Sequence, residues 1–222
     1  MPETKVLNMS EIDPEEVKWL WYPYIPFAKI TLVQGDPGEG KTSFILALSS
    51  LLTNGKSMPF SENKLSPCNV IYQTAEDGLA DTVRPRLDSY EADCKRVYVI
   101  DESVNRLSLS DSRLEEVIIK YDAKLLILDP MQAYLGEKVD MNSANKVRPE
   151  FESLSKMAER TGCAIVIIGH LNKMSGTKGI YRGLGSVDIN GAVRSILLVG
   201  KSNENEQQRI VGHLKCNLAP LV

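Results

Sequence analysis

The sequence predicts an α/β fold with a mostly parallel central sheet, helices on both faces and an antiparallel strand pair at one edge. Short, nearly uninterrupted apolar runs alternate with longer amphipathic segments, as buried parallel strands alternate with their connecting helices. Two further apolar runs near the C-terminus follow each other across one polar stretch, which is typical of an antiparallel pair. The 222 residues, 43% of them hydrophobic, suffice for one sizeable core with a short arm.

Each element is predicted from its own stretch of sequence. The parallel strands are expected at KITLVQ, NVIYQTA, RVYVID, KLLILD and AIVIIGH, with helices between them over residues 41–53, 78–90, 111–121 and 144–160. The stretches RSILLVG and QRIVGHLKC, separated by KSNENEQQ, form the expected edge pair. Residues 1–28 are rich in proline, which favours an extended arm or cap, anchored by WLWYPYIP, over a core element. We therefore divide the chain into an N-terminal arm, residues 1–28, and one domain, residues 29–222.

Composition excludes several classes of protein. A formal net charge of −3 excludes a generally basic nucleic-acid coat but leaves room for a local basic loop. The four cysteines form no C-x-x-C pair, so neither a zinc site nor a disulfide framework is indicated. Nothing at the N-terminus resembles a signal peptide, and no apolar run approaches the roughly 20 residues of a membrane helix. We expect a cytoplasmic protein with no membrane partner.

A glycine-rich stretch, VQGDPGEGKTSF, contains the spacing G-x-x-x-x-G-K-[ST] between a predicted strand and a predicted helix. Its glycines let successive N–H groups curl into a nest at the helix N-terminus, where unpaired donors and the helix dipole favour a phosphate. In such a loop Lys41 reaches the β- and γ-phosphates, and the Thr42 hydroxyl binds Mg²⁺. The sequence therefore predicts a site for ATP and Mg²⁺. The residues expected to bind the nucleotide are Gly35, Asp36, Pro37, Gly38, Glu39, Gly40, Lys41, Thr42 and Ser43.

Two other strands end in carboxylates. The strand LLILD ends at Asp129, at the sheet edge that also carries the phosphate loop, so we expect Asp129 to hold Mg²⁺ together with Thr42. The strand NVIYQTA is followed by Glu76 and Asp77, and a carboxylate there can orient and deprotonate the water that attacks the γ-phosphate. We expect Glu76 to be this base. Asp77 is the alternative base, and either residue could instead cap the helix that begins near Gly78.

The motifs GDPGEGKT, YQTAED, LLILDP and IVIIGH, in this order, resemble those of the RecA-like P-loop ATPases of the AAA kind. They are most similar to the RepA-like hexameric replicative helicases of plasmids, phages and integrated elements. The resemblance covers the chain from Trp19 to Pro220 and implies a RecA-like ATPase domain over residues 29–222. It further implies that ATP is hydrolysed at the subunit interfaces of a homo-hexamer, and that this hydrolysis drives movement along single-stranded DNA.

The resemblance also assigns roles to one histidine and two cations. His170 matches the polar sensor of the γ-phosphate, although a histidine at a strand end can also be purely structural. Arg194 matches the arginine finger, and Lys215 matches a basic piston, both acting on a neighbouring subunit. The alternative for both is an ordinary surface ion pair. Relatives commonly carry Arg or Lys where Asn217 stands, so the division of labour between Arg194 and Lys215 stays open.

Two loops are candidates for binding single-stranded DNA. The stretch LNKMSGTKGIYRGLGS carries Lys173, Lys178 and Arg182 among glycines, and mobile backbone with cations suits a sequence-neutral grip on DNA. The alternative is a solvated surface loop. The second candidate, residues 131–148, matches the region that lines the ring channel in relatives and carries one aromatic residue, Tyr134.

Other functions stay open at this point. A recombination-type ATPase would form filaments instead of rings. The choice between the two depends on the rotation that relates neighbouring subunits, which a sequence does not give. A regulatory ATP-binding switch would hydrolyse ATP slowly and act on a protein partner. A small-molecule kinase is the least favoured, since no acceptor site is recognisable. The chain carries no primase or winged-helix module and ends where relatives continue, so we expect one domain of a longer protein or a cut chain.

Overall fold

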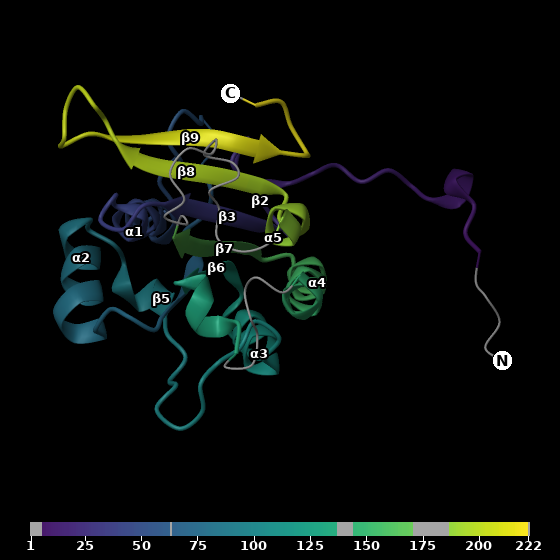
Figure 1. Cartoon of the computed structure of the whole chain (residues 1–222), viewed down its shortest axis with the longest axis horizontal. Coiled ribbons are helices and arrows are strands. Elements are labelled where there is room, and N and C mark those ends of the chain that lie inside the picture. Colours follow the sequence, from purple (N-terminus) through teal and green to yellow (C-terminus); the bar gives the residue numbers. More distant parts are fainter. Residues whose placement is uncertain (1–5, 63, 137–143, 171–186, 222) are drawn as a thin grey trace.

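The computed structural model describes residues 6–62, 64–136, 144–170 and 187–221. In this part of the chain one sheet has seven strands in the order β5-β4-β6-β7-β3-β8-β9 (Figure 1). All neighbouring strands are parallel except the last pair, in which β9 runs antiparallel to β8. The strands are β3 (Ile30–Gly35), β4 (Asn69–Thr74), β5 (Val97–Tyr98), β6 (Ala123–Asp129), β7 (Ala164–His170), β8 (Ser195–Lys201) and β9 (Arg209–Cys216). The predicted α/β fold with an antiparallel edge pair is confirmed.

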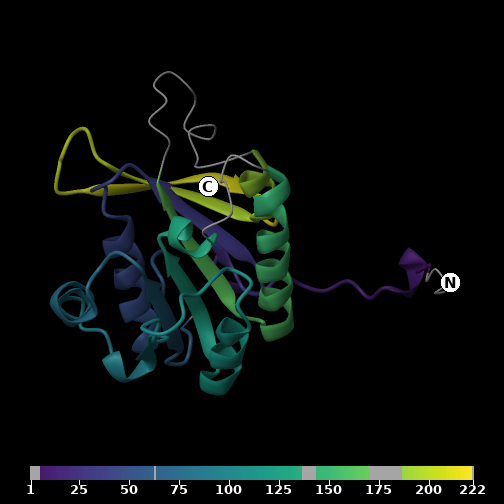
Figure 2. The ribbon, with the colours of Figure 1, turned by 60° about the horizontal axis from the view of Figure 1, so that its bottom comes forward.

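Helices cover both faces of this sheet (Figure 2). The strands are apolar throughout because each face has its own core. In β7, for example, Ile165 and Ile167 belong to one apolar cluster, whereas Val166 and Ile168 belong to the other. The first cluster includes α3 (Ser112–Tyr121), α4 (Ala144–Thr161) and α5 (Val187–Ala192), and the second includes α1 (Lys41–Thr53) and α2 (Arg84–Ser89).

Two predicted elements differ from the prediction, one in helix type and one in length. The helix expected over residues 78–90 is a π-helical turn, η2 (Leu79–Val83), followed by α2. The strand expected at RVYVID is only the two-residue β5. The side chain of Gln73 on β4 explains why β5 ends: its Oε1 accepts from the N–H of Ile100 and its Nε2 donates to the Ile100 carbonyl, both at 2.9 Å. The Gln73 side chain thus occupies the main-chain N–H and carbonyl of Ile100, which would otherwise have continued the hydrogen-bond ladder between β4 and β5.

Part of the predicted arm belongs to the core. The strands β1 (Trp19–Trp21) and β2 (Ile25–Pro26) form a small antiparallel sheet, and Leu20, Trp21 and Ile25 are buried in the cluster that contains α1. The indole N–H of Trp21 donates to the carbonyl of Pro59 at 2.9 Å. Residues 6–16 are exposed, and their trace leads away from the domain (Figure 1). The expectation that residues 1–28 form an arm or cap and no core element is therefore wrong for the anchor, residues 19–26, while the boundary at residue 28 stays a prediction.

The remaining short helices are η1 (Met9–Glu11), η3 (Cys94–Arg96) and η4 (Met131–Tyr134). The last of these begins two residues after Asp129, the end of β6, and packs into the cluster that also contains α3 and α4. The carboxyl ends of β3, β4, β6 and β7 lie at one edge of the sheet, because these strands are parallel neighbours. This edge positions the site.

Candidate nucleotide site

The phosphate loop joins the carboxyl end of β3 to α1. Gly38 and Gly40 have φ angles of 78° and 90°, in the left-handed region that glycine adopts without strain. Gly40 is the N-cap residue of α1 and makes no side-chain cap, so the first N–H groups of the helix are not taken by a capping side chain. These donors and the helix dipole suit an anion at this end of α1.

Lys41 folds back over the loop. Its Nζ donates to the carbonyls of Gly35 and Asp36, both at 2.9 Å, and the residue is only 5% exposed. Burial lowers the pKa of the Lys41 ammonium, and nearby carboxylates, Asp129 foremost, offset part of this effect. The ammonium is therefore held by neutral carbonyls beside the cavity, and phosphate oxygens would be stronger acceptors for it.

Thr42 and Asp129, predicted to hold Mg²⁺, are in contact. The Thr42 hydroxyl donates to Oδ2 of Asp129 at 2.7 Å, and the hydroxyl of Tyr72 donates to the same oxygen at 3.0 Å. Asp129 is only 7% exposed. Burial raises the pKa of its carboxyl, and the two hydroxyl hydrogen bonds offset part of the rise. A buried, hydroxyl-bonded carboxylate next to the phosphate loop fits an Mg²⁺ that also binds phosphate and water oxygens.

Glu76 and Asp77 have different environments although they are neighbours. The hydroxyl of Thr74, the last residue of β4, accepts from the N–H of Glu76 at 3.4 Å and of Asp77 at 3.2 Å. Oδ2 of Asp77 accepts from Arg86 at 2.8 Å. Within the described part of the chain, the Glu76 carboxylate makes no hydrogen bond or ion pair. The geometry therefore favours Glu76 as the base, and Asp77 as the residue that holds Arg86.

These residues surround a cavity of about 280 Å³. His170 reaches it from the end of β7, where it is the register partner of Gly35. Its Nδ1 is buried and has no hydrogen-bond partner among the described residues. A polar atom left over in this way fits a contact to a ligand oxygen. The lining residues are Gly38, Gly40, Lys41, Thr42, Ser43, Thr74, Glu76, Asp77, Arg86, Asp129 and His170.

The edge strands β8 and β9 hold the phosphate loop from the other side. Glu39 accepts a hydrogen bond from the N–H of Lys201 through Oε2. A Cβ at Gly35 would lie 2.3 Å from the carbonyl oxygen of Val199, so only glycine fits between β3 and β8. A Cβ at Gly40 would lie 3.0 Å from Nε of Arg209. The loop is thus packed against a hairpin that lies more than 150 residues further along the chain.

Arg194 and Lys215 lie together, away from this cavity. Arg194 directly precedes β8, and its N–H donates to the Ile30 carbonyl at 3.0 Å. The side chain of Arg194 is exposed. Nζ of Lys215 donates to the carbonyls of Val193, at 2.9 Å, and Asn190. Burial, and then Arg194, lower the pKa of Lys215. The phosphate loop contacts β8 at Lys201, the other end of the strand. At about 3.3 Å per residue, this end lies about 20 Å from Arg194. Neither cation can serve its own phosphate loop.

The predicted DNA contacts divide into two groups. Lys173, Lys178 and Arg182 lie outside the described residues. Tyr134, the aromatic residue of the second candidate loop, is 1% exposed and packs in the core, so its ring offers no stacking surface to DNA, while a DNA contact by residues 131–148 stays a prediction. The described part of the chain contains no group of three His, Cys, Asp or Glu side chains that could hold a metal ion. None of its helices is long and apolar enough to span a membrane.

Sequence reasoning missed three residues of the site. Tyr72 donates to Asp129, Arg86 pairs with Asp77, and the Thr74 hydroxyl accepts from the N–H groups of Glu76 and Asp77. A threonine two residues before a pair of acidic residues was the available signal for Thr74. Tyr72 and Arg86 carry no such signal, because their partners become neighbours only when β6 and α2 pack beside β4.

Replacement of Asp129 by Asn should raise the stability of the ligand-free protein and remove its response to Mg·ATP. A buried carboxyl with a raised pKa favours unfolding once the pH exceeds its ordinary value of about 3.9, so the gain of D129N grows with rising pH and disappears below that value. At pH 7 we expect a Tm increase of about 2–4 °C, which corresponds to about 1 kcal/mol.

Thermal unfolding with and without Mg·ATP measures both effects. Mg·ATP should raise the Tm of the parent more than that of D129N, since the variant lacks the carboxylate that holds Mg²⁺. Asp122→Asn is the matched control, because Asp122 is exposed and, among the described residues, its carboxylate forms an ion pair with surface Lys124. A D129N protein that is less stable than the parent at pH 7 without ligand would contradict the prediction.

The parallel sheet, the phosphate loop after β3 and Asp129 at the end of β6, two strands away, define a RecA-like P-loop ATPase. The family of AAA domains called AAA_25 matches residues 2–176, and the chain belongs to this family.

Known proteins with related sequences and structures agree with this class. The DNA repair protein RadA of Halalkalibacterium halodurans is 28% identical over 152 residues, and RadA of Bacillus subtilis is 24% identical over 153 residues. These matches cover 68% of this chain but only 29% of each relative. The crystal structure of the KaiC-like protein PH0186 from Pyrococcus horikoshii OT3 superposes with a TM-score of 0.59 at 16% identity. That match covers 87% of this chain and 81% of the other, and it supports the fold.

Proposed function

We propose that this chain is a ring-forming ATPase that couples ATP hydrolysis to movement on single-stranded DNA, as a hexameric, cytoplasmic helicase-type motor in the replication of a mobile element. One observation carries the proposal. Arg194 and Lys215 lie side by side at the far end of β8 from their own phosphate loop. Cations placed there can stabilise a γ-phosphate only in the site of another subunit, so a complete site needs an assembly.

Within one subunit, the described residues divide the chemistry of hydrolysis. The nest of the loop and Lys41 bind the β- and γ-phosphates of ATP. Thr42 and Asp129 hold Mg²⁺, which when bound neutralises charge on the phosphate oxygens. Glu76 orients the attacking water and takes its proton.

Two further residues surround the γ-phosphate in this proposal. Arg86, held by Asp77 at the cavity wall, adds a cation from the same subunit. His170, whose Nδ1 has no partner within the described residues, contacts the γ-phosphate from the end of β7. Its position directly before residues 171–186 would connect the presence of the γ-phosphate to the predicted DNA loop.

The relatives favour DNA as the polymer on which the motor acts. RadA is by its name a DNA repair protein, and its match covers 68% of this chain. The same name supports a second candidate function, a recombination-type ATPase that forms filaments on DNA. The two candidates share the trans-acting cations and differ in whether the assembly closes.

The test measures ATP turnover with and without single-stranded DNA, together with the mass of the assembly in the same buffers. We expect DNA to stimulate turnover and the parent to sediment as a closed ring. Arg194→Ala should bind ATP but hydrolyse it about 10³-fold more slowly. Lys41→Ala subunits keep Arg194 but have a dead pocket, so mixing the two variants should restore activity above the sum of the separate proteins.

The control mixture contains Arg194→Ala and the double variant Lys41→Ala/Arg194→Ala, which supplies no intact Arg194 and should restore nothing. An open filament, seen as mass that grows with concentration, would support the recombination-type candidate. If the parent is monomeric with and without DNA, and Arg194→Ala and Lys215→Ala both turn over at the parent rate, the chain is a switch and not a motor.

A further inference from the structure

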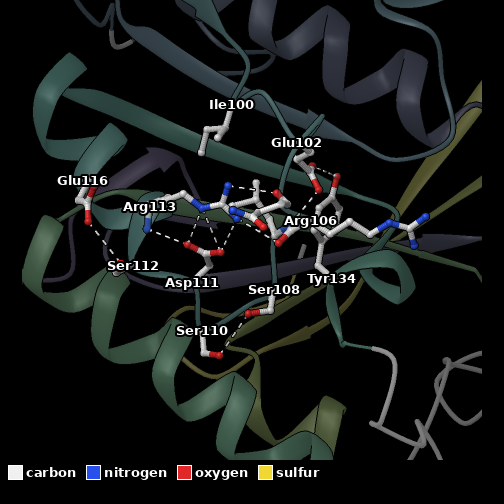
Figure 3. Close-up of polar contacts among 12 residues, drawn as sticks. Ile100, Glu102, Arg106, Ser108, Ser110, Asp111, Ser112, Arg113, Glu116 and Tyr134 are labelled. Atoms are coloured by element: carbon white, nitrogen blue, oxygen red, sulfur yellow. Dashed lines mark hydrogen bonds and ion pairs between the residues drawn. The ribbon is translucent and has the colours of Figure 1, made fainter.

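A half-buried carboxylate lies between the strand that carries the base and the segment that follows Asp129. Oε1 of Glu102 accepts from the side-chain amide of Gln73 and, at 3.5 Å, from the hydroxyl of Tyr134. Its Oε2 accepts from the N–H of Leu107 at 2.9 Å. Figure 3 shows Glu102 next to Tyr134. The three donors are neutral, and a carboxylate binds such donors more strongly than an amide does.

The loop that carries Glu102, residues 99–111, is fixed on its other side by α3. Arg113 donates to the carbonyls of Asn105, at 3.1 Å, and Arg106, at 3.0 Å, and its guanidinium also binds Asp111 (Figure 3). The N–H of Leu109 donates to the carbonyl of Tyr134 at 2.8 Å. These hydrogen bonds hold the loop against α3 on one side and against Tyr134 on the other.

Glu102 contacts both functional parts of the proposed motor. Gln73, which is 1% exposed, directly precedes Thr74, whose hydroxyl holds the N–H groups of Glu76 and Asp77. Tyr134 ends η4 in the segment that follows the Mg²⁺ ligand Asp129. A cavity of about 550 Å³ adjoins the nucleotide cavity at Thr74 and Glu76, and Glu102 lines it. Space next to the base thus allows it to move when its supports move.

We propose that Glu102 is a positioning residue for the base. Through its hydrogen bond to Gln73, which precedes Thr74, Glu102 fixes the position of Glu76. Through its hydrogen bond to Tyr134, Glu102 couples that position to the segment after Asp129. The second part rests on the proposed function, because it assumes that DNA acts on this segment. The first part requires only that Glu76 is the base.

Glu102→Gln is the sharpest variant because it keeps the shape of the side chain. The new amide has one acceptor oxygen and one NH₂ group. In either orientation the NH₂ group faces another donor, which is the N–H of Leu107 or the side-chain amide of Gln73, so one hydrogen bond is lost. The phosphate loop is untouched. We expect unchanged ATP affinity, a kcat lowered about tenfold, and a ratio of DNA-stimulated to basal turnover close to one. Ser110→Ala, on the exposed side of the same loop, should match the parent.

A double-variant cycle separates positioning from general damage. If Glu102 acts through the base, adding Glu102→Gln to Glu76→Gln should lower turnover no further, whereas a merely structural defect would lower it again. Tyr134→Phe, which removes only the hydroxyl, should by itself lower the DNA stimulation and serves as a second variant if Glu102→Gln folds poorly. Additive losses in the cycle, or a normal kcat in folded Glu102→Gln, would overturn the proposal. If the parent lacks DNA stimulation, the proposed function fails while the cycle still decides the role of Glu102.

Discussion

Replacement of Lys41 by alanine is expected to lower ATP turnover about 10³-fold and to weaken nucleotide binding strongly. The ammonium is only 5% exposed and lies against the carbonyls of Gly35 and Asp36, so it is already positioned beside the phosphate cavity. Alanine removes the positive charge that neutralises the β- and γ-phosphates, and no other lysine lines this cavity within the described residues. Steady-state ATPase rates and titration with a fluorescent ATP analogue measure the two losses.

Lys201→Ala is the matched control for this variant. Its main-chain N–H, which binds Glu39, remains after the substitution, and its own side chain is exposed. The control should therefore keep the turnover of the parent. Thermal unfolding without nucleotide should show that the Lys41→Ala protein is folded. A folded Lys41→Ala protein with undiminished turnover would refute the nucleotide site.

Glu76→Gln is expected to bind Mg·ATP with the affinity of the parent and to hydrolyse it about 10²- to 10⁴-fold more slowly. The amide keeps the shape of the carboxylate but cannot take a proton from water. Glu76 lines the cavity and has neither hydrogen bond nor ion pair for its carboxylate within the described chain, so its replacement should disturb no contact. A single-turnover measurement separates this loss from slow product release.

Asp77→Asn tests the assignment between the two neighbours. Because Asp77 is bound to Arg86 at 2.8 Å, its amide variant should loosen Arg86 and reduce turnover less than Glu76→Gln does. Arg86→Ala should then resemble Asp77→Asn, since both remove the same contact. If Asp77→Asn is the inactive protein and Glu76→Gln remains active, the base is Asp77 and the role of Arg86 must be reassigned.

The sequence alone determined the fold class, the phosphate loop and the approximate positions of two carboxylates, because each of these depends on a local pattern of residues. Strands buried on both faces must be apolar throughout, so the alternation of apolar runs and amphipathic segments sufficed for the fold class. A phosphate nest requires glycines, a lysine and a hydroxyl at fixed spacing, and these requirements lie within nine consecutive residues, 35–43. The approximate place of Asp129 and Glu76 also followed, because parallel strands end at one edge of the sheet.

Only the tertiary structure decided which side chains meet across elements. It paired Asp77 with Arg86, bound Tyr72 to Asp129 and buried Tyr134. It also placed Arg194 at the far end of β8 from the phosphate loop. The physical reason is that periodicity specifies which face of an element is buried but not which neighbour covers it. That neighbour depends on strand order, and here β4 lies beside β6 and β3 beside β8 although these strands are far apart in the chain.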